Sequence, residues 1–590
     1  MGHVTWKVGG AQGEGIDSTG EVLASTLNQL GYCLFAYRSF MSLIKGGHTS
    51  YKIRVGDCPV RYQGDTLDVL IAFDQLSIKE NEHELVDGAI VIHDAKFEPA
   101  FTVGKQFQVI KVPMSEKAKN LGNVIMKNMV ALGVSVQVLG LTPQPFFDYI
   151  DNRFAKKGGE VAENNKQAIE EGYEFCREHY PTITRPLPAP AGKPNYLLSG
   201  NEAAGFGALL GGCRFEVAYP ITPATEILYW AAAHWPRYGA KIMQAEDEIA
   251  ACIGAIAGNY AGVRSMTSTS GPGLALMMEA LGLAGISETP LVIMDVQRAG
   301  PSTGMPTKPE QSDLNTAVYG GHGEHPRIVI APSTVEECIY YGAEVFNLAE
   351  RFQCPVLLLS DLFLGMSKVT VPEEHMKFVG EFKIDRGKLV DQKYLDSLGD
   401  KPFLRHEVTE DGISPRSMPG QRGGSYTLLS NESSEECREE AEDPYNRMQQ
   451  MDKRARKMRG LPVDQIGIEY HAAPDDADPD LLLVGWGSTR AQLEEAHYQL
   501  ISEGHKVAHL HVKILEPFPK AAVAQCIGRA KRVLMVEQNS TGQLTELVKR
   551  NVPYHDKIQV HLRYDGIVLT VGEIHKRSLE VLQKLFAGVQ

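Results

Sequence analysis

The stretch from residue 216 to residue 273 constrains the fold of this chain more than any other part. At three places in it, 216–223, 246–248 and 267–273, a short run with the character of a strand leads directly into the start of a helix. At the first, Glu-Val-Ala-Tyr-Pro-Ile-Thr-Pro (216–223), Pro220 ends the run, and Thr222 with Pro223 predicts a helix with a hydroxyl N-cap and a proline in its first turn. Alternating strands and helices of this kind predict an α/β fold of several open sheets with flanking helices.

The second place is the acidic triplet Glu246-Asp247-Glu248, which precedes a helix that is apolar on every face (249–257). Such a helix is expected to be buried, so the triplet brings carboxylates to the edge of an apolar interior. Acids in a first helical turn complement the helix dipole, each by about 0.3–1 kcal/mol, and this role alone could explain the triplet. The alternative is a functional Glu248, because desolvation of a half-buried carboxylate favours sharing of a proton.

Four motifs around this acid resemble the α subunit of 2-oxoacid:ferredoxin oxidoreductases. They are Tyr219-Pro-Ile-Thr-Pro223, Glu248 with Ala261-Gly262, Thr267-Ser-Thr-Ser-Gly-Pro-Gly273, and Arg298-Ala-Gly-Pro-Ser-Thr-Gly-Met-Pro-Thr307. Their order over about ninety residues makes the signal specific, and the resemblance covers nearly the whole chain. It implies a thiamine diphosphate-binding fold of the pyrimidine type, with a γ domain before it and a domain like the transketolase C-terminal domain after it.

The resemblance also implies roles for individual residues. Glu248 would hydrogen-bond the aminopyrimidine ring of thiamine diphosphate and so promote loss of the proton from the thiazolium carbon. Thr222 would hold the carboxylate or carbonyl group of the substrate. Further cofactor contacts would come from Tyr219, Pro220 and Ile221, and further substrate contacts from Arg298, Thr303 and Thr307.

The position of Arg298 in the sequence also supports a role in binding the substrate. It lies just past an expected strand at 290–295, and ligands of an open parallel sheet bind beyond the carboxyl ends of the strands. A guanidinium at that point can hold a carboxylate by paired hydrogen bonds. The alternative is a structural ion pair over the strand edge, and Thr303 and Thr307 on their own would be turn residues.

The N-terminal region offers a second candidate site. An expected strand at 3–8 leads through Gly9-Gly-Ala-Gln-Gly-Glu-Gly15 into a helix, a pattern that favours anion binding. Its spacing differs from the dinucleotide fingerprint G-x-G-x-x-G, although a dinucleotide site and a tight turn that requires glycine remain alternatives. By the resemblance, Gly13, Glu14 and Gly15 would lie beside coenzyme A.

Lys45 stands in a second glycine-containing stretch, Arg38-Ser-Phe-Met-Ser-Leu-Ile-Lys-Gly-Gly-His48. This stretch resembles the γ portion of the same family, fused here in front of α. A lone lysine is usually a solvated surface group. The resemblance makes Lys45 a contact for a substrate carboxylate at the γ/α junction.

Proline density marks residues 186–194 as a semi-rigid linker. It separates an expected γ domain (1–185) from an expected pyrimidine-type domain (195–370). Residues 371–477 are irregular and charged, a composition typical of disorder or of an ordered loop that covers the active site or docks a partner chain. The last domain, 478–590, is similar to the transketolase C-terminal domain and is expected to serve packing and assembly.

Charge and cysteine usage limit the class of protein. The formal net charge is 59 − 73 = −14, which argues against nucleic acid or an anionic membrane as the main partner. No leader follows Met1 and no apolar run is long enough to cross a bilayer, so a cytoplasmic location is expected. The nine cysteines include no C-x-x-C pair, which fits reduced thiols and argues against an iron–sulfur cluster or a structural metal held by this chain alone.

The missing parts of the enzyme point to a second chain. The Gly-Asp-Gly motif that holds magnesium and diphosphate in thiamine enzymes is absent, and so are the cysteines of the cluster that one-electron transfer requires. The resemblance therefore implies a β subunit carrying Mg²⁺ and [4Fe-4S], an (αβ)₂ heterotetramer, and ferredoxin as electron acceptor. The implied reaction is the coenzyme A-dependent oxidative decarboxylation of a 2-oxoacid to acyl-CoA and CO₂. With low-potential ferredoxin it could run as a carbon-fixing carboxylation of the reductive TCA cycle.

Two cationic candidates, Lys45 and Arg298, suit a substrate with two carboxylates. We therefore expect 2-oxoglutarate rather than pyruvate or a broad range of 2-oxoacids, and the fused γ–α arrangement favours the same substrate by resemblance. Two hypotheses from other classes remain: a nicotinamide or flavin dehydrogenase built on the N-terminal glycine loop, and a non-catalytic subunit that only assembles with β.

Overall fold

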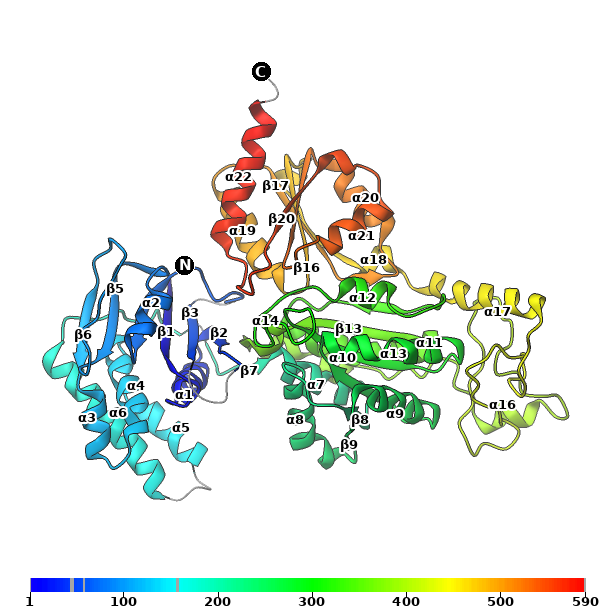
Figure 1. Cartoon of the computed structure of the whole chain (residues 1–590), viewed down its shortest axis with the longest axis horizontal. Coiled ribbons are helices and arrows are strands. Elements are labelled where there is room, and N and C mark those ends of the chain that lie inside the picture. The colour runs from blue at the N-terminus through cyan, green and yellow to red at the C-terminus, as the bar shows by residue number, and fades with distance from the viewer. Residues whose placement is uncertain (1, 43–46, 57–58, 155–158, 191, 588–590) are drawn as a thin grey trace. The chain divides into compact units, whose positions relative to one another are not determined.

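The computed structural model describes residues 2–42, 47–56, 59–154, 159–190 and 192–587. These residues form two compact units: unit 1 is Met1–Ser199 with Met366–Met376, and unit 2 is Gly200–Gly365 with Lys377–Gln590. Three open sheets with flanking helices confirm the α/β class expected from the sequence (Figure 1).

Unit 1 is built on an eight-stranded sheet in the order β6-β5-β4-β1-β3-β2-β14-β7. From β1 to β6 the neighbouring strands are parallel, and from β1 to β7 each strand is antiparallel to its neighbour. The strands are β1 (His3–Ala11), β2 (Cys33–Ser39), β3 (His48–Gly56), β4 (Leu67–Ala72), β5 (Leu85–Asp94), β6 (Gln108–Val112), β7 (Tyr196–Ser199) and β14 (Lys368–Val371). The helices are α1 (Ile16–Gln29), α2 (Gln75–Asn81), α3 (Met114–Asn120), α4 (Lys127–Val138), α5 (Gln144–Phe154) and α6 (Gly159–His179).

Strand β14 joins unit 1 from a distant part of the chain. It lies between β2 and β7, and the Thr370 hydroxyl accepts a hydrogen bond from the Leu34 backbone N–H at 3.1 Å. The Lys368 ammonium lies 2.6 Å from the Glu21 carboxylate on α1. The sheet of unit 1 is therefore completed by a strand that comes about 170 residues after β7 in the sequence.

The larger sheet of unit 2 has seven strands in the order β18-β12-β13-β11-β10-β8-β9, all parallel except β18. They are β8 (Phe215–Ala218), β9 (Lys241–Gln244), β10 (Ser265–Thr269), β11 (Leu291–Gln297), β12 (Ile328–Ile330), β13 (Pro355–Asp361) and β18 (Ile514–Glu516). The helices around it are α7 (Gly200–Leu210), α8 (Thr225–His234), α9 (Glu248–Tyr260), α10 (Gly271–Leu276), α11 (Met278–Ile286), α12 (Leu314–Tyr319), α13 (Val335–Phe352) and α14 (Leu362–Met366). The central strand β11 is buried along its whole length, as expected where helices cover both faces of a parallel sheet.

The smaller sheet of unit 2 has the order β15-β17-β16-β19-β20. Helices α19 and α22 lie on one side of it, and α20 and α21 lie on the other (Figure 1). Its strands are β15 (Ile468–His471), β16 (Leu481–Trp486), β17 (Val507–Val512), β19 (Arg532–Glu537) and β20 (Ile558–Leu562). The helices are α18 (Val463–Ile466), α19 (Arg490–Ser502), α20 (Lys520–Arg529), α21 (Gln543–Asn551) and α22 (Val571–Ala587).

The two sheets of unit 2 share one hydrophobic core, which includes Leu357 of β13 and Leu510 of β17. Gln311 ties them further, because its side chain donates to the Trp486 carbonyl at 2.9 Å and its backbone N–H donates to the Gln538 carbonyl at 2.7 Å. Strand β18 also crosses over and pairs with β12. The two sheets therefore form one packed body.

Residues 377–477 are largely irregular before α18 and β15 begin, with the short helices α15 (Phe378–Glu381) and α16 (Gln392–Ser397) and the longer α17 (Pro444–Arg456). Two fully buried carboxylates fix this segment to the rest of unit 2. Glu288 lies 2.5 Å from the Lys453 ammonium and 2.7 Å from the Lys457 ammonium, and Glu350 binds Arg416 at 2.7 Å. The segment is thus held by charges that lie far apart in the sequence.

The cysteines correct one expectation. Cys33 is disulfide-bonded, so the prediction of reduced thiols is wrong for this residue. The tertiary fold can bring together cysteines that are widely spaced in sequence, and spacing alone does not reveal this. The free cysteines, all buried, are Cys176, Cys213, Cys252, Cys338, Cys354, Cys437 and Cys526.

Candidate functional site

Three of the four predicted motifs of unit 2 follow β8, β10 and β11, neighbouring strands of the seven-stranded sheet, and Glu248 follows β9, which lies next to β8. Because these strands are parallel, their carboxyl ends lie at one edge of the sheet. This edge is where ligands of open α/β sheets bind. The loops at 219–224, 270–273 and 298–308 therefore surround one candidate site.

The three acids of the triplet 246–248 differ in burial and in hydrogen bonding. Asp247 is the N-cap of α9, and its carboxylate accepts a hydrogen bond from the Ala250 backbone N–H at 2.7 Å. Glu246 is exposed, whereas Glu248 is only 6% exposed. Within the described residues, the Glu248 carboxylate makes no hydrogen bond or ion pair. Capping of the helix is therefore satisfied by Asp247 and leaves Glu248 unexplained.

Glu248 lies directly against the third motif. A Cβ atom added to Gly273 would lie 2.6 Å from Cγ and 2.7 Å from Oε1 of Glu248, and it would also collide with the Thr269 hydroxyl. Only glycine leaves room for the carboxylate at this point. The acid and the 267–273 motif thus form one structural element, a cradle that a larger residue would fill.

The expectation that α9 is buried on every face is wrong. Ile249 is 50% exposed and Ile253 is 38% exposed, whereas Ala251, Cys252 and Ala255 are buried. The sequence pattern cannot distinguish a helix covered by its own chain from one whose apolar side faces outward. One side of α9 is thus an exposed apolar surface.

The first and fourth motifs meet through Arg298. Its Nη1 donates to the backbone carbonyl of Thr222 at 2.7 Å. Arg298 is 7% exposed as a residue, its Nε has no partner, and no described carboxylate lies within ion-pair distance of its guanidinium. Burial lowers the pKa of Arg298 somewhat, and the nearby Asp313 carboxyl opposes this shift. A buried, incompletely bonded guanidinium is available to an anionic ligand.

Thr222 does not cap a helix, so that expectation is wrong. A turn closed by the Thr225 backbone N–H and the Ile221 carbonyl at 3.0 Å precedes α8, whose N-cap is Ala224. The Thr222 hydroxyl therefore remains without a partner among the described residues. Of its neighbours, Pro220 and Ile221 are half-buried and Tyr219 is 39% exposed.

The loop after Arg298 separates the two predicted threonines. Backbone hydrogen bonds from Ala299 to Lys308 at 3.0 Å and from Met305 to Ala299 at 2.9 Å close this loop. Thr307 is buried and Thr303 is exposed. The structure thus brings Thr307 towards the interior and leaves Thr303 at the surface.

Sequence reasoning missed a group of buried acids near this edge of the sheet. Glu216 on β8 is fully buried, and one of its oxygens accepts a hydrogen bond from the Ser268 hydroxyl at 2.8 Å. Burial raises the pKa of Glu216 to about 7, and the Ser268 hydrogen bond partly opposes this shift. Asp295 on β11 and Asp313 before α12 form a second group. A charged residue inside an otherwise apolar strand was the available signal.

In unit 1, the glycine loop after β1 turns through Gly13 (φ 96°) and Gly15 (φ 81°), conformations that favour glycine. The Glu14 carboxylate accepts from the Ala11 backbone N–H at 2.9 Å and lies 2.6 Å from the Lys127 ammonium. Glu14 therefore has a structural role within the loop. The predicted Lys45 lies outside the described residues.

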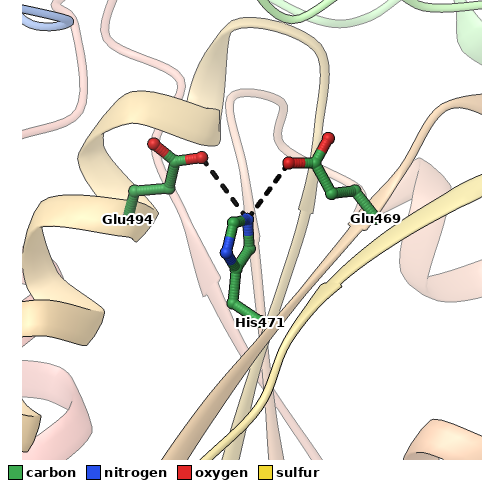
Figure 2. A group of neighbouring side chains, drawn as sticks. All are labelled: Glu469, His471 and Glu494. Carbon is green, nitrogen blue, oxygen red and sulfur yellow. Dashed lines mark ion pairs between the residues drawn. The ribbon is translucent and has the colours of Figure 1, made fainter. Parts of the chain in front are cut away.

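A possible metal-binding group lies in the smaller sheet of unit 2. His471 Nε2 faces Glu469 and Glu494 at 3.2 Å and 3.5 Å, as Figure 2 shows. However, Arg490 binds both carboxylates, at 2.7 Å for Glu494, and Lys513 binds Glu469 at 2.5 Å. These two side chains already supply the positive charge that a metal ion would bring. The group is an ion-pair network that joins β15 to α19.

The described helices include none whose length and hydropathy would allow it to span a membrane.

Comparisons with known proteins cover nearly the whole chain. Residues 206–453 match the family model "Pyruvate flavodoxin/ferredoxin oxidoreductase, thiamine diP-bdg". Residues 5–175 match "Pyruvate ferredoxin/flavodoxin oxidoreductase", and residues 479–574 match "Pyruvate:ferredoxin oxidoreductase core domain II".

The similar proteins match this chain over nearly the full length of both chains. The α subunit of a 2-oxoacid:ferredoxin oxidoreductase from Sulfolobus sp is 30% identical over 98% of this chain and 97% of its own. The 2-oxoglutarate oxidoreductase subunit KorA of Mycobacterium tuberculosis is 29% identical over 97% of this chain and 90% of its own. A solved structure of 2-oxoglutarate:ferredoxin oxidoreductase from Magnetococcus marinus, with 2-oxoglutarate, coenzyme A and succinyl-CoA bound, is 34% identical with a TM-score of 0.91 over 99% of this chain and 100% of that chain.

Proposed function

The chain belongs to the 2-oxoacid:ferredoxin oxidoreductase family as an α subunit, and we propose that its enzyme acts on 2-oxoglutarate. The observation that carries this proposal is full-length similarity to an enzyme with 2-oxoglutarate, coenzyme A and succinyl-CoA bound. In the proposed reaction, 2-oxoglutarate, coenzyme A and two oxidised ferredoxins give succinyl-CoA, CO₂, two reduced ferredoxins and a proton. The reverse direction is a reductive carboxylation.

The cradle formed by Glu248 and Gly273 fits the pyrimidine half of thiamine diphosphate. A buried carboxylate without a protein partner suits a hydrogen bond to a ring nitrogen, and it can hold and return a proton there. The bound cofactor supplies the carbon nucleophile and the electron sink of the reaction. Cofactor contacts on this chain would come from Tyr219, Pro220 and Ile221.

Substrate binding is assigned to the groups that the site leaves without partners. Arg298 presents a buried guanidinium for a carboxylate, and Thr222 presents a free hydroxyl for the carboxylate or carbonyl. Thr307 would support them from the buried side of the loop, and Thr303 only if the exposed part of the loop closes over the ligand. Lys45 would bind a second carboxylate, and Gly13, Glu14 and Gly15 would lie beside coenzyme A.

The rest of the active enzyme is assigned to a β subunit carrying Mg²⁺ and a [4Fe-4S] cluster, in an (αβ)₂ complex that reduces ferredoxin. Exposed apolar side chains around the edge strand β9 support such a partner, because apolar patches of this kind mark interaction surfaces. These side chains are Tyr229, Tyr238, Met243, Ile249, Ile253 and Val263.

The test is to purify the chain with its β subunit and to measure viologen reduction by several 2-oxoacids in the presence of coenzyme A. We expect the highest kcat/KM with 2-oxoglutarate. Pyruvate, which the three family models name, is the second candidate, and the same assay ranks the two. Absence of reduction with every 2-oxoacid, in a complex that contains cofactor and cluster, would refute the proposal.

Glu248→Gln tests the role of the acid. We expect turnover to fall by roughly a hundredfold or more while the complex still assembles. Glu246→Gln is the matched control, since this neighbouring acid is exposed. Normal turnover in Glu248→Gln would instead favour a non-catalytic assembly subunit or a dehydrogenase that uses another site.

A further inference from the structure

Two neighbouring acids lie close to the candidate site, the fully buried Asp295 and the half-buried Asp313, whose Oδ2 is itself buried. Asp295 on β11 is fully buried, neither of its carboxyl oxygens has a hydrogen-bond donor among the described residues, and its neighbouring acidic group is Asp313. The position of Asp313 is fixed, because its backbone N–H donates to Gln297 Oε1 at 3.1 Å and Gln297 in turn donates to the Ser360 carbonyl at 2.9 Å. The Asp313 backbone is thus anchored to β11, the strand that carries Asp295.

No donor other than a carboxyl proton is available to this pair. Among the described residues, no N–H or hydroxyl group reaches either oxygen of Asp295 or Oδ2 of Asp313. Two ionised carboxylates cannot hydrogen-bond each other, and two buried like charges repel strongly. Two neighbouring acids without another donor therefore favour at least one proton on the pair.

Two further charged groups, Glu310 and Arg298, face the pair. Both act on Asp313, whereas among the described residues Asp313 is the one charged group that acts on Asp295. Glu310 adds negative charge and Arg298 adds positive charge. On the α10 side, Gly271 contributes no charge, and a Cβ there would lie 2.7 Å from both oxygens of Asp313. Gly271 belongs to the same motif as Gly273, so the Asp pair and the Glu248 cradle lie against one turn.

We propose that Asp295 and Asp313 share a proton and act as positioning residues that keep Arg298 available to an anionic substrate. While the pair is protonated, Asp313 does not compete for the guanidinium. When the pair loses its proton, the resulting carboxylate attracts Arg298 and opposes binding of the substrate carboxylate. The role towards the substrate rests on the function proposed above, whereas the shared proton does not.

The acidity of the pair fits this arrangement. Burial, together with the neighbouring Asp313, raises the pKa of Asp295 well above its ordinary value. Burial and the Glu310 charge raise the pKa of Asp313 to about 7, and the neighbouring Asp295 and Arg298 partly oppose this. The charge beside Arg298 therefore changes near neutral pH.

Infrared difference spectra of the αβ complex without substrate test the shared proton directly. The complex is titrated from about pH 5 to about pH 9, and the carbonyl band of neutral carboxylic acids is compared in the wild type, Asp295→Asn, Asp313→Asn and Glu216→Gln. We expect each Asp variant to lose intensity that the Glu216 variant retains. If Glu216→Gln removes all of the neutral-acid band that titrates in this range, the Asp pair is ionised and the proposal is wrong.

Steady-state kinetics test the role towards Arg298. In the wild type we expect the KM for 2-oxoglutarate to rise by about tenfold as the pH increases through 7, because a charge appears near the guanidinium. Asp313→Asn should hold KM near its low-pH value at every pH, with kcat little changed, and Glu216→Gln should keep the wild-type dependence. An unchanged pH dependence of KM in Asp313→Asn overturns the positioning role. If no 2-oxoacid is turned over, the proposed function fails, and the infrared titration still decides on the shared proton.

Discussion

At the scale of single residues, the contact between Glu248 and Gly273 makes a sharp prediction. In Gly273→Ala the new methyl group would overlap the Glu248 carboxylate and displace it. Because misplacement of a reacting group by about 1 Å can cost a hundredfold in rate, we expect kcat to fall about a hundredfold. The measurement is viologen reduction by the αβ complex.

Gly282→Ala is the control for this substitution. Gly282 also lies in a helix, α11, and nothing lies within 4 Å of the position of its added Cβ. Alanine there should leave kcat unchanged. Equal losses in the two variants would show that helix geometry, and not the Glu248 cradle, is responsible.

Glu216 predicts a pH dependence of stability. Its pKa is raised from 4.5 to about 7, so the folded state binds more protons than the unfolded state between these values. The free energy of unfolding should therefore fall as the pH rises through this range, by an amount on the order of 3 kcal/mol from this residue. Chemical denaturation at several pH values should show a smaller fall in Glu216→Gln than in the wild type. A steeper fall in the variant would contradict the sign.

Predictions for single residues failed where the sequence pattern did not determine the local turn or the neighbouring side chains. Thr222 has the sequence of an N-cap, yet a turn precedes the helix and its hydroxyl stays free. Asp295 was missed because it stands in an apolar run, and sequence alone does not reveal that an acid at position 313 lies next to it. The placement of Glu248 at a helix start was predictable, since the acidic triplet stands directly before an apolar helix.

At the scale of elements, strands were the most predictable part of the fold. The expected strands at 3–8 and 290–295 correspond to β1 and β11. A short apolar run bounded by glycine, proline or charged residues is typical of a buried strand. Residues 377–477 have no such pattern. Their course depends on pairing of Glu288 and Glu350 with cations from distant parts of the chain, which composition does not encode.

Glu288→Gln should therefore release this segment. It would leave Lys453 and Lys457 buried without a counter-charge, and breaking a buried pair in this way costs about 3–5 kcal/mol. His406, whose pKa burial lowers to about 4, is neutral and cannot compensate by losing a proton. Limited proteolysis or hydrogen exchange should show greater exposure of 377–477.

The exposed pair of Lys388 and Asp411 in the same segment provides the comparison. Asp411→Asn should change stability by less than about 1 kcal/mol, as is usual for surface ion pairs. If the two variants released the segment equally, the buried carboxylate would not be what holds it.

At the scale of the whole molecule, the apolar surface around β9 predicts how the chain assembles. Tyr229→Glu on α8 places a charge within this surface, where the wild-type side chain is 66% exposed. We expect a large loss of β subunit in co-purification, because burial of an unpaired charge at an interface is costly. Tyr498→Glu on α19, at a tyrosine that is 56% exposed, should assemble normally. Retention of the β subunit by Tyr229→Glu would exclude this surface as the contact.

The place of β14 has a consequence for synthesis of the chain on the ribosome. The sheet of unit 1 lacks the strand between β2 and β7 until residues 368–371 have been translated. The growing polypeptide must therefore carry an open β2 edge while all of the strands β8 to β13 are synthesised. A gene divided after residue 199 would produce an N-terminal fragment without this strand.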